Sequence, residues 1–455
     1  MANRHGFHNQ RTTYNLRPML RHQPHAAGNP RSVLTLVLCT ILHGFTHAYG
    51  TLLVPLYLLI VADLKLGGVK GASLIVTVYG LVYCLGSYAA GVAADRANRK
   101  TLLGLGLLGN AGAILFMGLT RRYEVLLALA VLAGVGGTFF HPAASALIPA
   151  HFPKAPGMAI GLLGMGSGLG FFVGPQYAGW RAQAAGWHLG HVADWQRPCV
   201  ELGAAGLVFG ALFMILAREA PRSKDRQAAE ASPVLPKGMP LRILAIGGVL
   251  GCRDFAGVAG LSLASIYLQK AHGLGAARTG LIVGATMLLS ILVNPLAVFL
   301  TSGKRRLPAL DGVLLAGAAA ASVIPYAPLR YTLIVLCAFQ TFQLGSYAVS
   351  DAAMLERVSA NVRGRVVGLF LIIAGTFSST GPWVMGWWTD RLGMRASDPH
   401  AYAPLFGSLG IMMAIATLST PIIARLGAHG SMGQAELTRV DPLTEVMPRT
   451  LEPAG

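Results

Sequence analysis

The stretch GPQYAGW at residues 174–180 returns as GPWVMGW at residues 381–387, and this repeat decides the fold. Upstream of it, GMAIGL at residues 157–162 corresponds to GRVVGL at residues 364–369. The glycines of both pairs recur at one constant offset of 207 residues (381 minus 174). Both copies lie in long apolar segments, so the chain is predicted to consist of two related halves.

The composition is that of a membrane protein. Of the 455 residues, 54% are hydrophobic and only 12% are charged, whereas soluble domains carry about 25% charged residues. A helix of about 20 apolar residues spans the hydrocarbon core of a bilayer, and segments of this length recur along the chain. We predict twelve spans, at residues 33–61, 71–93, 101–119, 124–148, 157–179, 199–217, 241–268, 279–300, 307–327, 330–351, 364–388 and 402–426.

The repeat and the spans together predict an all-α membrane protein of two pseudo-symmetric six-helix bundles. This is the build of a secondary transporter, in which the substrate site lies between the two halves near the bilayer midplane. The predicted order along the chain is a basic, acid-free and disordered cytoplasmic N-tail (1–32), a first bundle (33–217), a cytoplasmic linker (218–240), a second bundle (241–426) and a disordered C-tail (427–455).

The basic residues indicate how the chain is oriented. The formal net charge of +18 would suggest a nucleic-acid partner in a soluble protein. Here the charges separate apolar runs and form no basic patch with aromatic residues, so we expect no nucleic-acid partner. Of the 36 Lys and Arg residues, 24 lie in the two tails and the even-numbered loops. The positive-inside rule therefore places both termini in the cytoplasm, and we expect a multi-pass protein of the inner (cell) membrane.

The loop between the second and third spans carries GVAADRANRK at residues 91–100. This run resembles the G-x-x-x-D-R-x-G-R-[RK] signature of the major facilitator superfamily, and it stands at the place in the chain where that family has it. The resemblance implies that this loop latches the cytoplasmic side and must break for inward opening; the latch residues would be Gly91, Asp95, Arg96, Arg99 and Lys100. Asn98 replaces the usual glycine, and asparagine tolerates the positive φ that such a turn can need.

Two further runs resemble exporters of this superfamily. The fifth span contains GFFVGPQYAG (residues 170–179), which looks like the glycine–proline signature of drug/proton antiporters. The fourth span contains GGTFFHPA (residues 136–143), which is similar to fosmidomycin-resistance-type exporters. Because the eleventh span repeats the first pattern, it can also be purely architectural. Small residues let helices approach closely; the predicted helix-packing residues are Gly170, Gly174, Pro175, Gly179, Gly381 and Pro382.

Polar residues inside the spans are candidates for the transport site, because charges at bilayer depth are costly. In the superfamily, spans one, four, seven and ten line the central cavity. Adjacent helix residues lie about 100° apart, so we expect that Arg253 and Asp254 cannot both point at one spot and that at least one has a partner elsewhere. The candidate substrate and proton site comprises Arg253, Asp254, His43, His47, His141, Gln340, Gln343 and Tyr347.

In this hypothesis Arg253 attracts an anionic or zwitterionic group, while Asp254 or a histidine carries the coupling proton. The competing interpretations are a structural Arg–Asp network and histidines that only pack. Outside the candidate site, Asp390-Arg391-Leu392-Gly393 echoes the loop signature on the outer side, and we interpret it as a helix end and turn.

We predict a secondary transporter that works by alternating access and exports a small amphiphilic or anionic compound in exchange for protons. The alternatives are a proton-coupled uptake symporter for an organic anion and a non-transporting receptor with a transporter fold. The sequence shows no catalytic motif and no P-loop, so we do not expect an enzyme, a catalytic residue, a cofactor or a metal site. The expected partners are a small-molecule substrate, protons and the lipid bilayer, with the chain as a monomer.

Overall fold

The computed structural model of the chain describes residues 29–184, 192–220, 238–289, 305–358 and 363–426, with a few single residues between 290 and 304. Within these ranges the chain is helical and contains no β-strand, as the all-α prediction requires. The predicted C-tail, residues 1–28 of the predicted N-tail and most of the predicted linker lie outside the described residues; the last residues assigned to the N-tail belong to a helix that begins at Pro30.

Each half is a set of consecutive helices. The first half comprises α1 (Pro30–Thr51), α2 (Tyr57–Asp63), α3 (Val69–Arg96), α4 (Arg99–Met117), α5 (Tyr123–Thr138), α6 (Phe140–His151), α7 (Pro156–Gln183) and α8 (Arg197–Leu216). The second half comprises α10 (Met239–Lys270), α11 (Ala276–Leu288), α13 (Arg306–Val323), α14 (Leu329–Leu355), α15 (Arg363–Ser379), α16 (Gly381–Asp390), α17 (Ala403–Ile415) and α18 (Ser419–Ala424).

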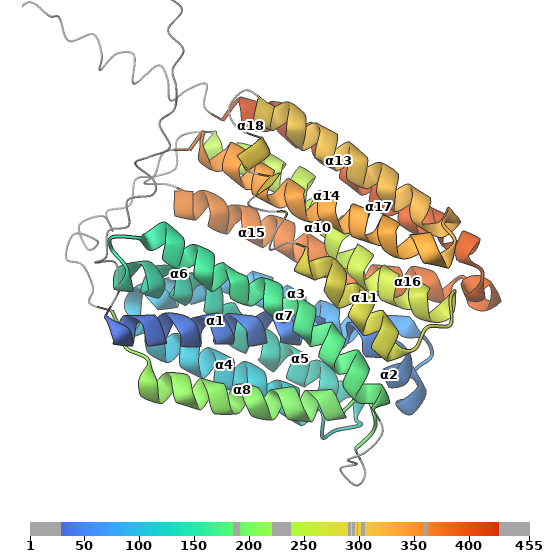
Figure 1. Cartoon of the computed structure of the whole chain (residues 1–455), viewed down its shortest axis with the longest axis horizontal. Coiled ribbons are helices and arrows are strands. Elements are labelled where there is room, and N and C mark those ends of the chain that lie inside the picture. The colour runs from blue at the N-terminus through green and yellow to red at the C-terminus, as the bar shows by residue number, and fades with distance from the viewer. Residues whose placement is uncertain are drawn as a thin grey trace, which may run out of the picture.

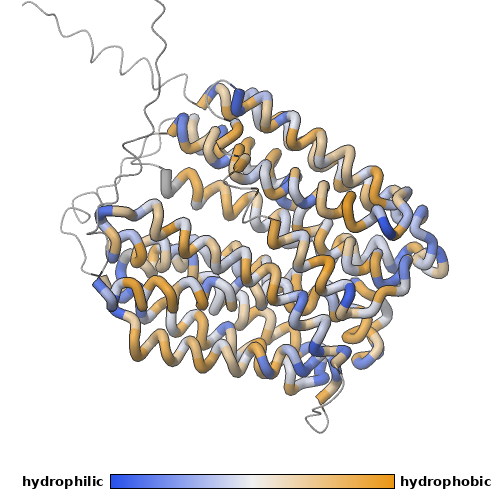
Figure 2. Tube along the Cα trace, viewed as in Figure 1, coloured by the Kyte–Doolittle hydropathy of each residue, from blue (hydrophilic) through white to orange (hydrophobic). Residues whose placement is uncertain are grey.

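Eleven of the twelve predicted spans are confirmed, each at its predicted place. Eleven segments of the described chain are long and apolar enough to cross a membrane, and α11 is a shorter apolar helix in the place of the eighth span. Every segment begins within three residues of its predicted start. Figure 2 shows hydrophilic segments gathered at the two ends of the helices and mostly hydrophobic ones between them, the pattern expected for a chain in a bilayer.

The start of α1 and the end of α18 lie on the same side of the molecule (Figure 1). We call this the terminal side, and the opposite one the far side. A separate core of buried apolar residues fills each half: one runs from Leu36 to Ala220 and the other from Ile243 to Leu426. The first core also takes in Ala276 and Val283 of α11, because α11 packs closely against α7.

The repeated glycines occupy equivalent places in the two halves. A Cβ atom on Gly174 of α7 would lie 2.6 Å from the carbonyl oxygen of Ala48 on α1. A Cβ atom on Gly381 of α16 would lie 2.8 Å from the Cβ of Ala259 on α10. In both halves the absent side chain lets two helices approach to backbone distance. The helix-packing role predicted for these glycines therefore has the same physical basis in each half.

The second glycine of each copy faces the other half. A Cβ atom on Gly179 would lie 2.8 Å from the carbonyl carbon of Ala276 on α11, and one on Gly386 would lie 3.1 Å from the Cα of Lys70 on α3. The helix pairs α7–α11 and α3–α16 thus close the far side in the same way, through a glycine that lets the two helices approach closely. The two prolines differ, since α7 continues through Pro175 whereas the chain divides into α15 and α16 just before Pro382.

Candidate functional site

The second half holds a buried charge pair on α10. Nε of Arg253 donates to Oδ1 of Asp254 at 2.7 Å, and Nη2 lies 2.6 Å from the same oxygen. The expectation that these adjacent side chains cannot meet is wrong, because the long arginine side chain folds back onto its neighbour. The second part of that expectation holds, since Nη1 donates to the carbonyl oxygen of Ser346 at 3.2 Å and to Oγ of Ser350 at 2.7 Å.

Residues of α14 cover this pair. The guanidinium group of Arg253 lies 3.8 Å from the centre of the Tyr347 ring, a cation–π distance. Arg253 has no exposed surface and Asp254 is 6% exposed. The guanidinium group of Arg253 is thus buried and paired with Asp254, and its Nη2 has no hydrogen-bond partner among the described residues.

The two glutamines of α14 lie in different surroundings. Gln343 is buried and packs against α10, where a Cβ atom on Gly257 would lie 2.6 Å from its Cδ. Gln340 is also buried, and its Nε2 lies 3.6 Å from Sδ of Met287 on α11. It lines a cavity of about 10 Å³ between α10, α11 and α14, which has room for a single water molecule. Gln343 and Tyr347 thus line the α10 contact, whereas Gln340 lies toward α11.

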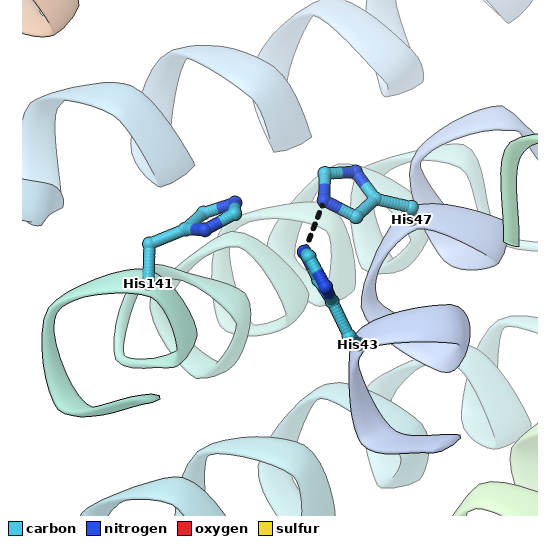
Figure 3. Close-up of side chains that lie close together, drawn as sticks. All are labelled: His43, His47 and His141. Atoms are coloured by element: carbon cyan, nitrogen blue, oxygen red, sulfur yellow. Dashed lines mark hydrogen bonds between the residues drawn. The ribbon is translucent and has the colours of Figure 1, made fainter. Parts of the chain in front are cut away.

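The first half brings three histidines together, which we call the histidine cluster: His43, His47 and His141. Figure 3 shows their rings turned toward one another, two from α1 and one from α6. Nε2 of His47 lies 3.1 Å from Nε2 of His43. His43 is 5% exposed, and its Nδ1 lies 2.8 Å from the carbonyl oxygen of Leu163 on α7. His141 is the exposed member.

Local sequence explains the cluster. His43 and His47 are four residues apart, so they share one face of α1. The fourth span breaks between α5 and α6, and α6 begins at Phe140 with Pro142 in its first turn, where a missing N–H is tolerated. This break places His141 at the start of α6. A Cβ atom on Gly166 would lie 3.0 Å from the Cβ of His43, so that glycine lets α1 approach α7.

Two of the predicted latch residues have partners within the first half. Arg99 is buried, and its Nη1 donates to the carbonyl oxygen of Ala146 at 3.5 Å. The amide of Lys100 donates to Oε2 of Glu219 at 2.8 Å. Arg96 is exposed, the side chain of Asp95 lies outside the described part, and no atom lies within 4 Å of a Cβ position on Gly91. A latch to the second half stays a prediction.

Asn98 has a role that the sequence argument did not foresee. Its φ is −66°, so the positive φ considered for this position is not used. Instead Oδ1 accepts from the amide of Thr101 at 2.8 Å and caps α4. Asparagine is among the preferred N-cap residues, which gives this residue a structural role in place of the glycine of the signature that the loop resembles.

The far side carries polar contacts between the halves that the sequence analysis missed. Oδ1 and Oδ2 of Asp390 accept from the amides of Val69 at 2.8 Å and Lys70 at 3.0 Å. Oγ of Ser262 donates to the hydroxyl of Tyr57 at 3.0 Å. Asp390 was interpreted as a helix end, and α16 does end there. Its carboxylate also caps the start of α3 in the other half, and only the position of an acidic residue at a span end hinted at this.

Replacing Asp390 by alanine is expected to loosen the far side, because two amides at the start of α3 lose their acceptor. The loss of an N-cap costs about 0.5–2 kcal/mol, which corresponds to about 2- to 30-fold in the ratio of far-side-closed to far-side-open molecules. Accessibility of a cysteine introduced at Thr77, in a variant without native cysteines, measures this ratio. The matched control is Asp398→Ala, since Asp398 caps only its own segment at His400. Equal labelling of both variants would show that Asp390 does not stabilise the closed far side.

Comparison with known proteins adds the following. The family model described as Major Facilitator Superfamily matches residues 36–252. The multidrug resistance protein MdtH of Shigella dysenteriae is 32% identical over 93 residues, which is 20% of this chain and 23% of MdtH. The agnestins efflux protein AgnL12 of Paecilomyces divaricatus is 27% identical over 161 residues, which is 33% of this chain and 36% of AgnL12. The chain thus matches about a quarter to a third of these relatives.

Solved structures match over nearly the whole chain. A bacterial homologue of the human lysosomal transporter Spinster, inward-facing and occupied, has a TM-score of 0.67 at 18% identity and covers 89% of this chain and 97% of its own. A D-xylose–proton symporter has a TM-score of 0.66 at 16% identity and covers 86% and 96%. At this identity the likeness shows the fold. The Major Facilitator Superfamily model thus matches just under half of the chain, and the solved structures show that the chain shares the fold of these transporters.

Proposed function

We propose that the protein exports a small amphiphilic or anionic compound across the inner membrane in exchange for protons. The observation that carries this proposal is the buried Arg253–Asp254 pair beneath Tyr347. Protonation of Asp254 would release the guanidinium group for an anionic substrate, and loss of the proton would return it to Asp254. The pair thus supplies a physical means by which proton and substrate occupy one site in turn.

Export is favoured over uptake by the names of the two curated relatives, a multidrug resistance protein and an efflux protein. The basic residues favour a cytoplasmic terminal side. With that orientation, closure of the far side by Asp390, Gly179 and Gly386 corresponds to an inward-facing state. An exporter takes up its cargo in this state.

Substrate flux in proteoliposomes with an imposed pH gradient tests the proposal. Candidate anionic and amphiphilic compounds are screened with the lumen acidified, and accumulation or depletion is recorded for each. Proton-coupled export predicts movement of the compound against the proton flow. Movement in the same direction would establish the uptake symporter instead, and an absence of flux for every compound would favour the receptor.

Replacing Asp254 by asparagine is expected to preserve substrate binding and to abolish the effect of the pH gradient. Asparagine has nearly the same shape but cannot take up a proton, so Arg253 would stay available to the substrate. Binding is measured by the dissociation constant of the purified protein, and coupling by flux with and without the gradient.

The matched control is Asp311→Asn on α13, whose carboxylate accepts a hydrogen bond from Thr420 outside the candidate site. This control variant is expected to keep both substrate binding and the effect of the pH gradient on flux. Unchanged coupling in the Asp254 variant would contradict its role as the proton carrier and direct attention to the histidines.

A further inference from the structure

We propose that His43, His47 and His141 form a three-imidazole binding site for a divalent transition-metal ion of the Zn²⁺ type. The sequence analysis expected no metal site. Only two of these histidines share a helix, and the fold brings in the third. One ring nitrogen from each of the three histidines lies within 4.8 Å of those of the other two. The proposal does not depend on the direction or coupling of transport.

The distances suit a metal with imidazole ligands. Zn–N bonds measure about 2.0–2.1 Å in tetrahedral sites, which separates two ligand nitrogens by about 3.3 Å. The Nε2 atoms of His43 and His47 are 3.1 Å apart. A third ligand within 4.8 Å needs only a side-chain rotation, and His141 is exposed and attached to the first turn of α6. Two ligands are therefore in place and the third is within reach.

The surroundings fix the nitrogen that would bind. Nδ1 of His43 donates to the carbonyl oxygen of Leu163, which leaves a lone pair on Nε2 of the neutral ring. A hydrogen bond from the second ring nitrogen to a backbone carbonyl is the usual way in which proteins orient a metal-binding histidine. The His43 ring also stacks on Phe140 at 4.5 Å between centroids, and His47 lies 4.4 Å from Phe171. These contacts hold the first two ligands.

Electrostatics favours a metal ion over three charged rings. The ring centroids lie 4.8, 5.2 and 5.4 Å apart, so simultaneous protonation would crowd three positive charges into one space. A single divalent ion uses the same three lone pairs and carries less charge. Three imidazoles leave a fourth position open, and water or an anionic ligand would complete the site.

Zn²⁺ binding to the full-length protein, purified without a polyhistidine tag, tests the proposal. Every sample carries glutamine in place of four N-terminal histidines, His5, His8, His22 and His25, so that these residues cannot bind Zn²⁺. Chelator competition is expected to show one ion per chain. The variants His47→Ala and His141→Asn are expected to weaken binding at least tenfold, whereas the matched control His151→Ala on α6, which contacts Ser32 and the carbonyl of Arg218, is not.

A second measurement covers a variant that folds poorly. Co²⁺ in a tetrahedral three-histidine site gives visible absorption bands, and these should disappear in His141→Asn, whose substitution is at an exposed position. Absence of a bound ion from the tail-substituted protein, or equal affinity in His141→Asn and His151→Ala, would overturn the proposal. Either result would leave the exporter proposal intact, because flux is measured separately.

Discussion

Replacing Arg253 by alanine is expected to reduce transport by at least about 30-fold. Removal of one member of a buried charge pair costs about 2–5 kcal/mol, and Arg253 is the cation that Asp254, Ser350 and the Tyr347 ring all contact. Arg253→Lys is expected to lose most of the flux as well. A lysine keeps the charge but cannot reach Asp254 and Ser350 with separate nitrogens in one plane. Initial flux in proteoliposomes, normalised to inserted protein, measures the effect.

Stability has to be separated from transport in this experiment. Arg253→Ala leaves the Asp254 carboxylate buried without its cation, a loss of about 3–5 kcal/mol in folding stability. The double variant Arg253→Ala/Asp254→Ala removes both charges and is expected to recover thermal stability while flux stays low. Arg242→Ala on the same helix is the control, since that side chain is partly exposed and donates to the carbonyl oxygen of Arg425. Normal flux in the double variant would exclude the pair from the transport site.

Replacing Gly386 by leucine is expected to open the far side and to slow transport. The new side chain would meet the backbone of Lys70 on α3, where a Cβ atom alone would lie 3.1 Å from Cα. Overpacking costs about 1–3 kcal/mol, so the ratio of far-side-closed to far-side-open molecules should fall by about 5- to 150-fold. Labelling of a cysteine at His47 by a membrane-impermeant maleimide from the far side, in a variant without native cysteines, measures the opening.

Because Gly179 is the counterpart of Gly386 in the repeat, a leucine at position 179 is expected to have the same effect. Gly179→Leu on α7 should increase the labelling in the same way, because that glycine contacts the backbone of Ala276. Gly407→Leu on α17 is the control, since no atom lies within 4 Å of its Cβ position. Labelling that rises in the control as well would point to general loosening, and labelling unchanged in all three would contradict the closure described at these glycines.

The fold was predictable because its signals are local or repeated. Spans follow from runs of apolar residues, and the pairing of Gly174 with Gly381 needed only a constant offset. In the structure Gly174 packs against Ala48 and Gly381 packs against Ala259, so the two glycines make equivalent helix contacts in the two halves. Both contacts follow from the repeat in the sequence and from the small size of glycine.

The candidate site was predictable in composition but not in its contacts. His43 and His47 share a helix face, yet the meeting with His141 depends on a helix break and on the packing of three helices. The pairing of Arg253 with its neighbour depends on a side-chain rotamer, which helix geometry does not fix. The capping of α3 by Asp390 joins residues 320 positions apart, and no local pattern reports such a contact.

The far-side closure has a consequence for the speed of the carrier. Besides its apolar contacts it includes polar ones, such as those of Asp390 with two amides and of Ser262 with Tyr57. Water can replace each such partner, so the net gain per hydrogen bond is only about 0.5–1.5 kcal/mol. A purely apolar contact of the same area would gain no hydrogen bonds from water when the two halves separate, so its opening would be slower. The polar contacts of the far side can therefore be exchanged for water one at a time, which keeps the free-energy cost of each opening step small.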